Sequence, residues 1–357
     1  MSLSEIVLDA NTAAQHERLA RMLRLPDSWV WDFWIAQDIA TDTDAGQRVS
    51  GVYHAFFLFA SKALHHPDRR HLRAGVGHAV STDLVQWERV PDALVRGDAP
   101  DFDQTATWTG SVIQGPDGRW FMFYTGITDR AGTLVQRIGV ATSADLLTWT
   151  KHHGNPVLDA DPRWYEKHGG PSPWQDQHWR DPWVFADPAG DGWHLLITAR
   201  AAEGPIDDRG VIGHAWSADL TNWHARPPLS EPGSGFGQLE VPQVELVDGR
   251  AVLIFNCLHR ELSSERQART SRSVCIWAAP AAGLLGPYDI AGATPLTDDS
   301  LYVGKLVRDR TGRWVLLAFE NAGPDGSFGG VLTDPMPVRW DGDHLVVASA
   351  ESQAFAG

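Results

Sequence analysis

The sequence is poor in cysteine and in positive charge. It has two cysteines, Cys257 and Cys275, in 357 residues, too few for a disulfide framework. Each lies in an apolar run, so we expect two buried free thiols and a reducing compartment, the cytoplasm. Lysine and arginine together number 30 against 45 aspartates and glutamates, a formal net charge of −15. Because phosphate binding needs clustered Lys and Arg, this balance argues against nucleic acid or an anionic membrane surface as partner.

Long hydrophobic runs and metal-binding spacings are also lacking. No run approaches the roughly 18 apolar residues needed to span a bilayer, and no basic segment followed by an apolar stretch opens the chain. The 15 histidines are scattered, without a zinc-type spacing. We therefore predict no membrane span, no cofactor and no metal in the site, while a structural calcium or sodium ion in the channel and the oligomeric state stay open. Four histidines in strand-like segments are expected to pack in the interior: His54, His78, His178 and His214.

Tryptophan, in contrast, is abundant, with 17 residues. Aromatic faces are costly to expose and stack well on sugar rings, but they also fill the cores of repeated units. Both interpretations remain open for the set as a whole. A neutral small molecule or oligosaccharide is the favoured ligand.

The pattern of apolar residues changes once along the chain. Residues 4–25 place apolar side chains at helical spacing up to Pro26, which predicts a helical lead-in over residues 1–26. After it the spacing is that of strands. The sequence therefore predicts an all-β domain over residues 27–357.

One phrase occurs three times in this domain: a glycine, a short apolar run, a Ser/Asp turn and a tryptophan. The copies span residues 77–87, 139–149 and 213–223, with looser versions at 274–277 and 330–334. An apolar run precedes each unit, at residues 53–59, 120–124, 193–197, 251–255 and 314–319. Shorter first strands lie ahead of those, around residues 32–34, 108–111, 180–182, 240–242 and 302–305.

Five units of several strands, repeating about every 60 to 75 residues, predict a five-bladed β-propeller. The segment at 344–348 is expected to complete the terminal blade. A β-sandwich with long loops is the alternative fold, and it explains the repeat less well.

Three of the five first strands carry an acid: Asp32, Asp181 and Glu240. First strands line the central channel of a propeller, so acids from different blades should meet in one pocket. Like charges and desolvation then raise at least one of their pKa values. A protonated carboxylic acid beside an ionised one is what cleavage of a glycosidic bond requires.

Each acid also has a structural interpretation. Asp32 could cap a turn, Asp181 could simply pair with Arg180, and Glu240 could be a solvated glutamate at a strand edge. Asp38 and Glu245 are the alternative acids for the site.

Five segments around these acids have motif-like sequences. They read Trp-Asp-Phe-Trp at 31–34, Trp-Thr-Gly-Ser at 108–111, Phe-Tyr-Thr-Gly at 123–126, Arg-Asp-Pro at 180–182 and Glu-Val-Pro-Gln at 240–243. In this order they resemble the five-bladed propeller glycoside hydrolases that act on fructosides, namely invertases, inulinases and levanases, with the levansucrases as relatives. The first is most similar to the levansucrase Trp-Asp-x-Trp segment and takes the place of the invertase Asn-Asp-Pro-Asn. The last resembles Glu-Cys-Pro-Asp, and the C-terminal β-sandwich usual in invertases is lacking.

The resemblance implies a retaining β-fructofuranosidase that hydrolyses sucrose or short fructans, with fructosyl transfer left open. It implies Asp32 as nucleophile, Asp181 as stabiliser bonded to fructosyl hydroxyls and Glu240 as general acid/base. Neighbouring residues on the first strands are expected to bind the sugar: Trp31, Trp34, Trp108, Ser111, Arg180, Trp183 and Tyr302.

Two other functions stay open. Propeller glycosidases that debranch arabinan or xylan also use two aspartates and a glutamate, and they invert the anomeric centre. A propeller that binds carbohydrate without turnover could use Trp34, Trp108 and Trp183 as stacking platforms, although a pure binder has no need for three converging acids.

Overall fold

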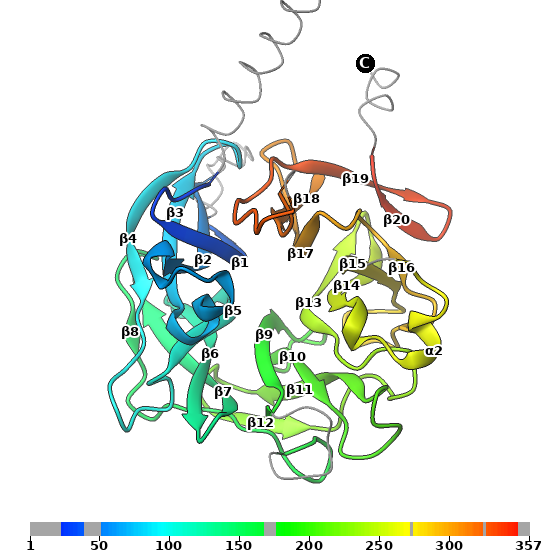
Figure 1. The fold of residues 1–357 in the computed structure, drawn as a ribbon. Helices are drawn as coiled ribbons and strands as arrows, with labels where there is room; N and C mark the ends of the chain where they lie inside the picture. The colour runs from blue at the N-terminus through cyan, green and yellow to red at the C-terminus, as the bar shows by residue number, and fades with distance from the viewer. Residues whose placement is uncertain (1–22, 39–50, 168–175, 272–273, 324–325, 349–357) are drawn as a thin grey trace, which may run out of the picture.

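The computed structural model describes residues 23–38, 51–167, 176–271, 274–323 and 326–348. These residues form five four-stranded antiparallel sheets around a central axis (Figure 1). The prediction of a five-bladed β-propeller is therefore confirmed. The predicted helical lead-in falls mostly on residues 1–22, outside the described residues, and residues 23–26 are not helical. No helix in the described ranges is long and apolar enough to cross a membrane.

Each blade is built from strands consecutive in sequence, and its first strand lies nearest the axis. The first blade has β1 (Ser28–Gln37), β2 (Tyr53–Ser61), β3 (Gly75–Ser81) and β4 (Glu88–Leu94). The second has β5 (Ala106–Gln114), β6 (Trp120–Arg130), β7 (Thr133–Ser143) and β8 (Thr150–Lys151). The third has β9 (Trp179–Ala186), β10 (Trp193–Arg200), β11 (Gly210–Ser217) and β12 (Trp223–Arg226).

The last two blades follow the same order. The fourth has β13 (Glu240–Val247), β14 (Arg250–Leu258), β15 (Val274–Pro280) and β16 (Thr294–Pro295), and the fifth has β17 (Leu301–Arg308), β18 (Trp314–Glu320), β19 (Met336–Asp341) and β20 (His344–Val347). The connections hold the short helical segments η1 (Lys62–Leu64), η2 (Pro67–Arg73), η3 (His259–Glu261) and α2 (Ser264–Gln267).

The repeated phrase forms the third strand and the turn after it. In the first copy the Ser81 hydroxyl accepts a hydrogen bond from the Asp83 amide at 3.1 Å. The Asp83 carboxylate in turn accepts hydrogen bonds from the amides of Val85 and Gln86. Leu84 then takes a left-handed conformation with φ of 65° and is fully buried. The same pattern recurs in the other two copies. The tight turn is therefore stabilised by side-chain acceptors and by burial of its leucine.

Only one of the two looser copies of the phrase forms the strand that was expected of it. Residues 274–277 belong to β15, the third strand of the fourth blade, as expected. Residues 330–334 do not form the corresponding strand, because β19 takes that place six residues later in the chain. The prediction that residues 344–348 complete the last blade is confirmed, since β20 pairs with β19.

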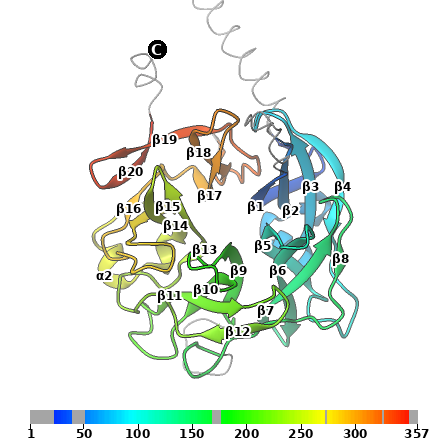
Figure 2. The same ribbon diagram turned by 180° about the vertical axis from the view of Figure 1, so that it is seen from behind.

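Among the residues that the structure describes, no strand is exchanged between the first and last blades, so the ring closes by packing between them. Figure 2 shows β17 and β18 beside β1 and β2 from the other side of the ring. Apolar side chains of both blades share one core cluster. The Tyr53 hydroxyl donates to the Arg308 carbonyl at 3.0 Å, and the Leu332 amide donates to the Leu23 carbonyl at 3.3 Å.

Candidate active site

The first strand of every blade contains one extra residue at the same height in the channel. Its register against the second strand shifts at or beside Asp32, Thr109, Asp181, Val241 and Val303. A β-bulge bends its strand and changes the direction of the neighbouring side chains. Five bulges at one height therefore direct side chains from all five blades to one region of the axis.

The backbone at these bulges is strained. Left-handed φ angles occur at Asp32 (24°), Asp181 (57°), Val241 (50°) and Val303 (46°). Such angles are uncommon for aspartate and true outliers for a β-branched valine. Each costs on the order of 1–3 kcal/mol and persists where the surrounding structure enforces it, typically at functional sites.

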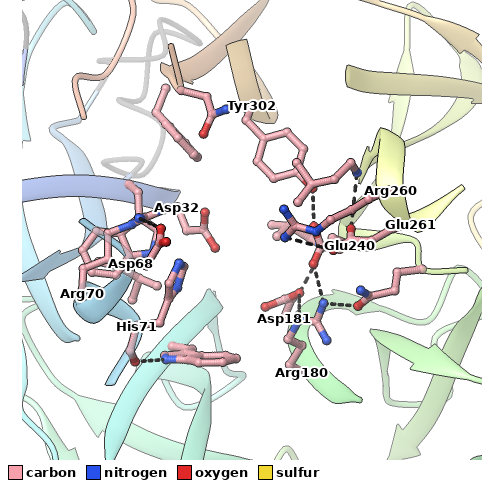
Figure 3. A pocket seen from close by; sticks show the side chains of 18 of the residues that line it. Asp32, Asp68, Arg70, His71, Arg180, Asp181, Glu240, Arg260, Glu261 and Tyr302 are labelled. Atoms are coloured by element: carbon pink, nitrogen blue, oxygen red, sulfur yellow. Dashed lines mark hydrogen bonds and ion pairs between the residues drawn. The ribbon is translucent and has the colours of Figure 1, made fainter. Parts of the chain in front are cut away.

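A cavity of about 1100 Å³ opens at this height. Asp32, Asp181 and Glu240 all line it, although they come from the first, third and fourth blades. In Figure 3 Asp32 lies on one side, with Arg70 and His71, and Glu240 and Asp181 lie across the cavity from it. Four of the predicted sugar-binding residues line the same cavity: Trp31, Trp108, Arg180 and Tyr302.

Asp32 has few hydrogen-bond partners. Its Oδ2 accepts one hydrogen bond from the Thr109 hydroxyl at 2.7 Å. Burial raises the pKa of Asp32 from its usual range to about 7, and the nearby Asp181 and Glu240 raise it further, whereas Thr109 and Arg70 oppose the shift. This aspartic acid therefore exchanges its proton near neutral pH.

Asp181 is almost completely buried beneath the cavity. Its Oδ2 accepts from the Thr198 hydroxyl at 2.8 Å and from the Val241 amide at 3.3 Å, and the Arg180 Nε lies 3.3 Å away. Burial raises the pKa of Asp181, and the cation of Arg180 works against that shift. The carboxylate is thus held in one orientation by the third and fourth blades together.

Glu240 is held from two sides. Arg180 donates from Nη2 to its Oε1 at 2.5 Å, and the Tyr302 hydroxyl donates to its Oε2. Arg180 is itself fixed by donation to Gln136 at 3.3 Å and to Gln238. Burial disfavours the cation of Arg180, but the charges of Glu240 and Asp181 outweigh that cost and raise its pKa.

A lysine lies deeper in the channel. Lys305 is 2% exposed, and its Nζ lies 5.1 Å from the ring centroid of Trp183. Burial lowers the pKa of Lys305 to about 8, although Asp181 and Asp32 favour its charged form. It therefore contributes positive charge below the acids at neutral pH.

Three predicted sugar-binding residues do not line the cavity. Trp34 is fully buried and stacks on Phe56, with ring centroids 6.1 Å apart. Ser111 joins two blades, since its hydroxyl donates to the Pro182 carbonyl at 2.7 Å and accepts from the Val184 amide. Trp183 lies under Lys305, away from the cavity's lining. All three lie two residues after the bulged position of their strand.

The alternative acids lie elsewhere. Asp38 is exposed at the end of the first strand, and Glu245 is not part of the cavity's lining. Burial raises the pKa of Glu245 to about 7. Neither competes for a position between the three acids.

Several lining residues were not expected from the sequence. They are Arg70, His71, Gln136, Gln238 and Glu261. Burial lowers the pKa of His71 to about 3 and raises that of Glu261 to about 8, with Glu240 as a second cause for Glu261. The position of Gln238, two residues before Glu240 on the same approach, was the one signal available in the sequence. The other four come from connections or second-blade strands that carry no motif.

The described residues contain no group of three or more His, Cys, Asp or Glu side chains arranged to hold a metal ion. The cavity instead offers carboxyl groups on two facing walls, with an arginine and a tyrosine fixing one of them. Facing carboxyl groups can protonate a glycosidic oxygen from one side and attack the anomeric carbon from the other.

Comparison with known proteins agrees with this arrangement. The model of the glycosyl hydrolases family 32 N-terminal domain matches residues 37–279, about two thirds of the chain. The chain belongs to glycosyl hydrolase family 32. The matched segment includes Asp181 and Glu240, and it begins after Asp32 and ends before Tyr302. The resemblance found in the motifs is therefore confirmed at the level of the family.

Individual family-32 relatives match parts of the chain. The acid β-fructofuranosidase 4, vacuolar, of Arabidopsis thaliana is 35% identical over 38% of this chain and 20% of its own length. The sucrose:sucrose 1-fructosyltransferase of Festuca arundinacea is 32% identical over 49% of this chain and 25% of its own length. The matched regions thus span a quarter or less of these two relatives.

A solved structure extends the likeness to the whole fold. The inulosucrase from Halalkalicoccus jeotgali bound to kestose has a TM-score of 0.71 and 22% identity, covering 93% of this chain and 94% of its own. At this level of identity the likeness concerns the fold.

Proposed function

We propose that this family-32 protein is a retaining β-fructofuranosidase that hydrolyses sucrose or short fructans. The observation that carries the proposal is the position of Asp32 and Glu240 on facing walls of one cavity, with Asp181 on the same side as Glu240. Family membership and the motif order support the fructosyl substrate.

Each acid has a distinct role in this proposal. Asp32 attacks the anomeric carbon, and Glu240 protonates the departing glycosidic oxygen and then activates water in the second step. Asp181 is held by Thr198 and the Val241 amide, so it suits the fixed binding of sugar hydroxyls rather than attack. Trp108, which is partly exposed in the cavity, supplies an apolar face for the sugar ring.

The protons of the three acids must be distributed correctly before reaction. Attack requires ionised Asp32, whose pKa of about 7 leaves it partly protonated near neutral pH. Interacting acids titrate as a group. The fall of kcat/KM on the acid side of its pH profile, the acid limb, therefore reports the pKa of the cluster and not of one residue. We expect kcat/KM to fall as the pH drops below about 7, because the nucleophile then binds a proton.

The proposal is tested with sucrose, a short fructan and an aryl arabinofuranoside, using Asp32→Asn enzyme as the control. Proton NMR of the sugar released first identifies its anomer. Release of β-fructofuranose from the fructosides supports the proposal. Initial release of the inverted anomer would favour the inverting debranching enzymes, and sugar binding without any product would favour a non-catalytic binding propeller.

Fructosyl transfer and cellular location are finer parts of the proposal. Transfer would appear as trisaccharide formed at high sucrose concentration, and its absence there would restrict the enzyme to hydrolysis. We place the enzyme in the cytoplasm, a proposal supported by two buried cysteines without a disulfide. Recovery of the protein in a secreted or vacuolar fraction would contradict this location.

A further inference from the structure

Arg70 lies where the first and last blades meet at the cavity. It belongs to η2 and is 9% exposed. Its guanidinium carbon lies 4.1 Å from the ring centroid of Phe328 and 5.3 Å from the ring centroid of Trp31. Phe328 belongs to the last blade, and Trp31 directly precedes Asp32. The guanidinium thus packs between two rings that come from opposite ends of the chain.

The positive charge of Arg70 is poorly compensated by its neighbours. Within the described residues its Nη1 donates one hydrogen bond, to the Pro67 carbonyl at 2.9 Å, and its Nε is buried without a partner. The nearest carboxylate, Asp68, is 3.8 Å away on a side chain that is 82% exposed. A buried charge is costly unless it is paired, so a charge retained here implies a use for its field.

We propose that Arg70 is the positioning residue of the nucleophile: it clamps the strand that carries Asp32 against the last blade and keeps the Asp32 carboxyl ionised for attack. This inference rests on the function proposed above. An arginine suits both tasks, because a planar guanidinium stacks on aromatic faces and remains charged when buried.

Charged groups approach Asp32 from every wall of the cavity. Burial and the charges of Asp181 and Glu240 raise the pKa of Asp32, and the Thr109 hydrogen bond and, more weakly, the charge of Arg70 lower it. Lys305 adds positive charge from below, and Thr109 donates the hydrogen bond already described. His71, beside Arg70, stays neutral because burial lowers its pKa to about 3. Arg70 is therefore the cation on the nucleophile's own wall.

The test separates the charge of Arg70 from its packing. Arg70→Met keeps an apolar stem without charge, and Arg70→Lys keeps the charge without the planar group. Phe328→Leu weakens the clamp and leaves the charge in place. Arg69→Met is the matched control, because Arg69 is an exposed neighbour outside the cavity's lining.

The acid limb of the kcat/KM profile is the decisive readout, with Tm as the measure of packing. We expect Arg70→Met to move the limb to higher pH, so that the ratio of activities at pH 6 and pH 8 falls about threefold or more, the change produced by a half-unit shift. Arg70→Lys should keep the wild-type limb with a lower Tm. Phe328→Leu should lower Tm and leave the acid limb at its wild-type pH, and Arg69→Met should change neither.

An unmoved limb in Arg70→Met would overturn the proposal, and so would a limb that moves in Phe328→Leu. If Arg70→Met does not fold, Arg70→Gln provides the same loss of charge with a polar stem. If the wild type hydrolyses no fructoside, the proposed function fails, and ¹³C NMR titration of the Asp32 carboxyl in wild type and Arg70→Met then tests the field of Arg70 directly. An identical titration in the two proteins would overturn it.

Discussion

The two walls of the cavity hold their carboxyl groups in different ways. On the wall of the fourth blade, Glu240 accepts hydrogen bonds from Arg180 and Tyr302, and Arg180 is itself held by two glutamines. On the wall of the first blade, Asp32 accepts one side-chain hydrogen bond, from Thr109. One carboxyl is fixed by a network, and the other is left with free acceptor capacity beside the cavity.

This difference fits a division of labour between the acids. A nucleophile must present lone pairs that are not already occupied by donors, whereas an acid/base must be aimed at one oxygen and needs its position fixed. On the first-blade wall the backbone of Asp32 is strained, with a φ of 24°. Burial there also raises the pKa of its carboxyl group. The left-handed backbone and the desolvation of Asp32 both cost stability at the nucleophile.

The largest loss of activity is expected when the nucleophile on the first-blade wall is removed. We expect Asp32→Asn to lower kcat/KM by roughly four orders of magnitude or more, as for other nucleophiles. The same substitution should raise the free energy of unfolding at pH 8. Asp32 binds a proton more tightly in the folded state, so its ionisation destabilises the fold as the pH rises from about 4 to about 7.

Steady-state kinetics and denaturant unfolding at pH 5 and pH 8 measure both effects. The stability gain should appear at pH 8 and be small at pH 5. Near-wild-type turnover would rule out Asp32 as nucleophile, and a loss of stability at pH 8 would contradict the strain assigned to it.

Removing the cation from the opposite wall should have the next largest effect. Arg180→Met leaves Glu240 and Asp181 without their counter-charge, and we expect roughly a 10²- to 10³-fold loss of kcat/KM with about 3 kcal/mol lost from the free energy of unfolding. Kinetics and denaturant titration measure the two losses. Arg163→Met, at an exposed ion pair with Asp161, is the matched control and should change neither.

Tyr302→Phe sharpens the comparison by removing one hydrogen bond from the Glu240 network. We expect about a tenfold fall in kcat with little change in KM, since a hydrogen bond to a charged group is worth about 1.5–3 kcal/mol and Arg180 still holds the carboxylate. An effect as large as that of Arg180→Met would show that the tyrosine fixes Glu240 as strongly as the arginine does.

Thr109→Val gives the smallest expected effect, on the sparse wall. The substitution is nearly isosteric at a buried site and removes the hydrogen bond that favours the ionised form of Asp32. The pKa of Asp32 should rise, so the acid limb of kcat/KM should move to higher pH while activity at pH 8 falls less than about tenfold. A limb that moves to lower pH would contradict this assignment. Thr105→Val, at a hydroxyl that binds the Asp129 amide away from the cavity, is the control.

The sequence predicted the scaffold well because the scaffold repeats. The Ser/Asp turns at Asp83, Asp145 and Asp219 depend on local hydrogen bonds, and a pattern of local bonds is visible in a sequence. The meeting of the three acids in one pocket was predicted because the first strands line the central channel of a propeller. The five-bladed fold itself was predicted from the five repeating units of strands.

The prediction failed where a bulge changed the direction of side chains. Trp34, Ser111 and Trp183 were expected beside the sugar because they lie on the first strands, but none of them lines the cavity, and each follows the bulged position of its strand by two residues. Arg70 was not predicted, because η2 carries no repeat and its contact with Phe328 joins residues 258 positions apart in the sequence. Contacts of that kind depend on closure of the ring and leave no local pattern.

The central claim, that Asp32 forms a covalent bond to the sugar while Glu240 serves the leaving group, is tested most directly by trapping. Glu240→Gln enzyme is mixed with a fructoside whose leaving group departs without protonation, quenched, digested and examined by mass spectrometry. The account predicts one fructosyl unit on the peptide that contains Asp32, and none in the double variant with Asp32→Asn. An adduct on another residue, or rapid release of product without any adduct, would contradict it.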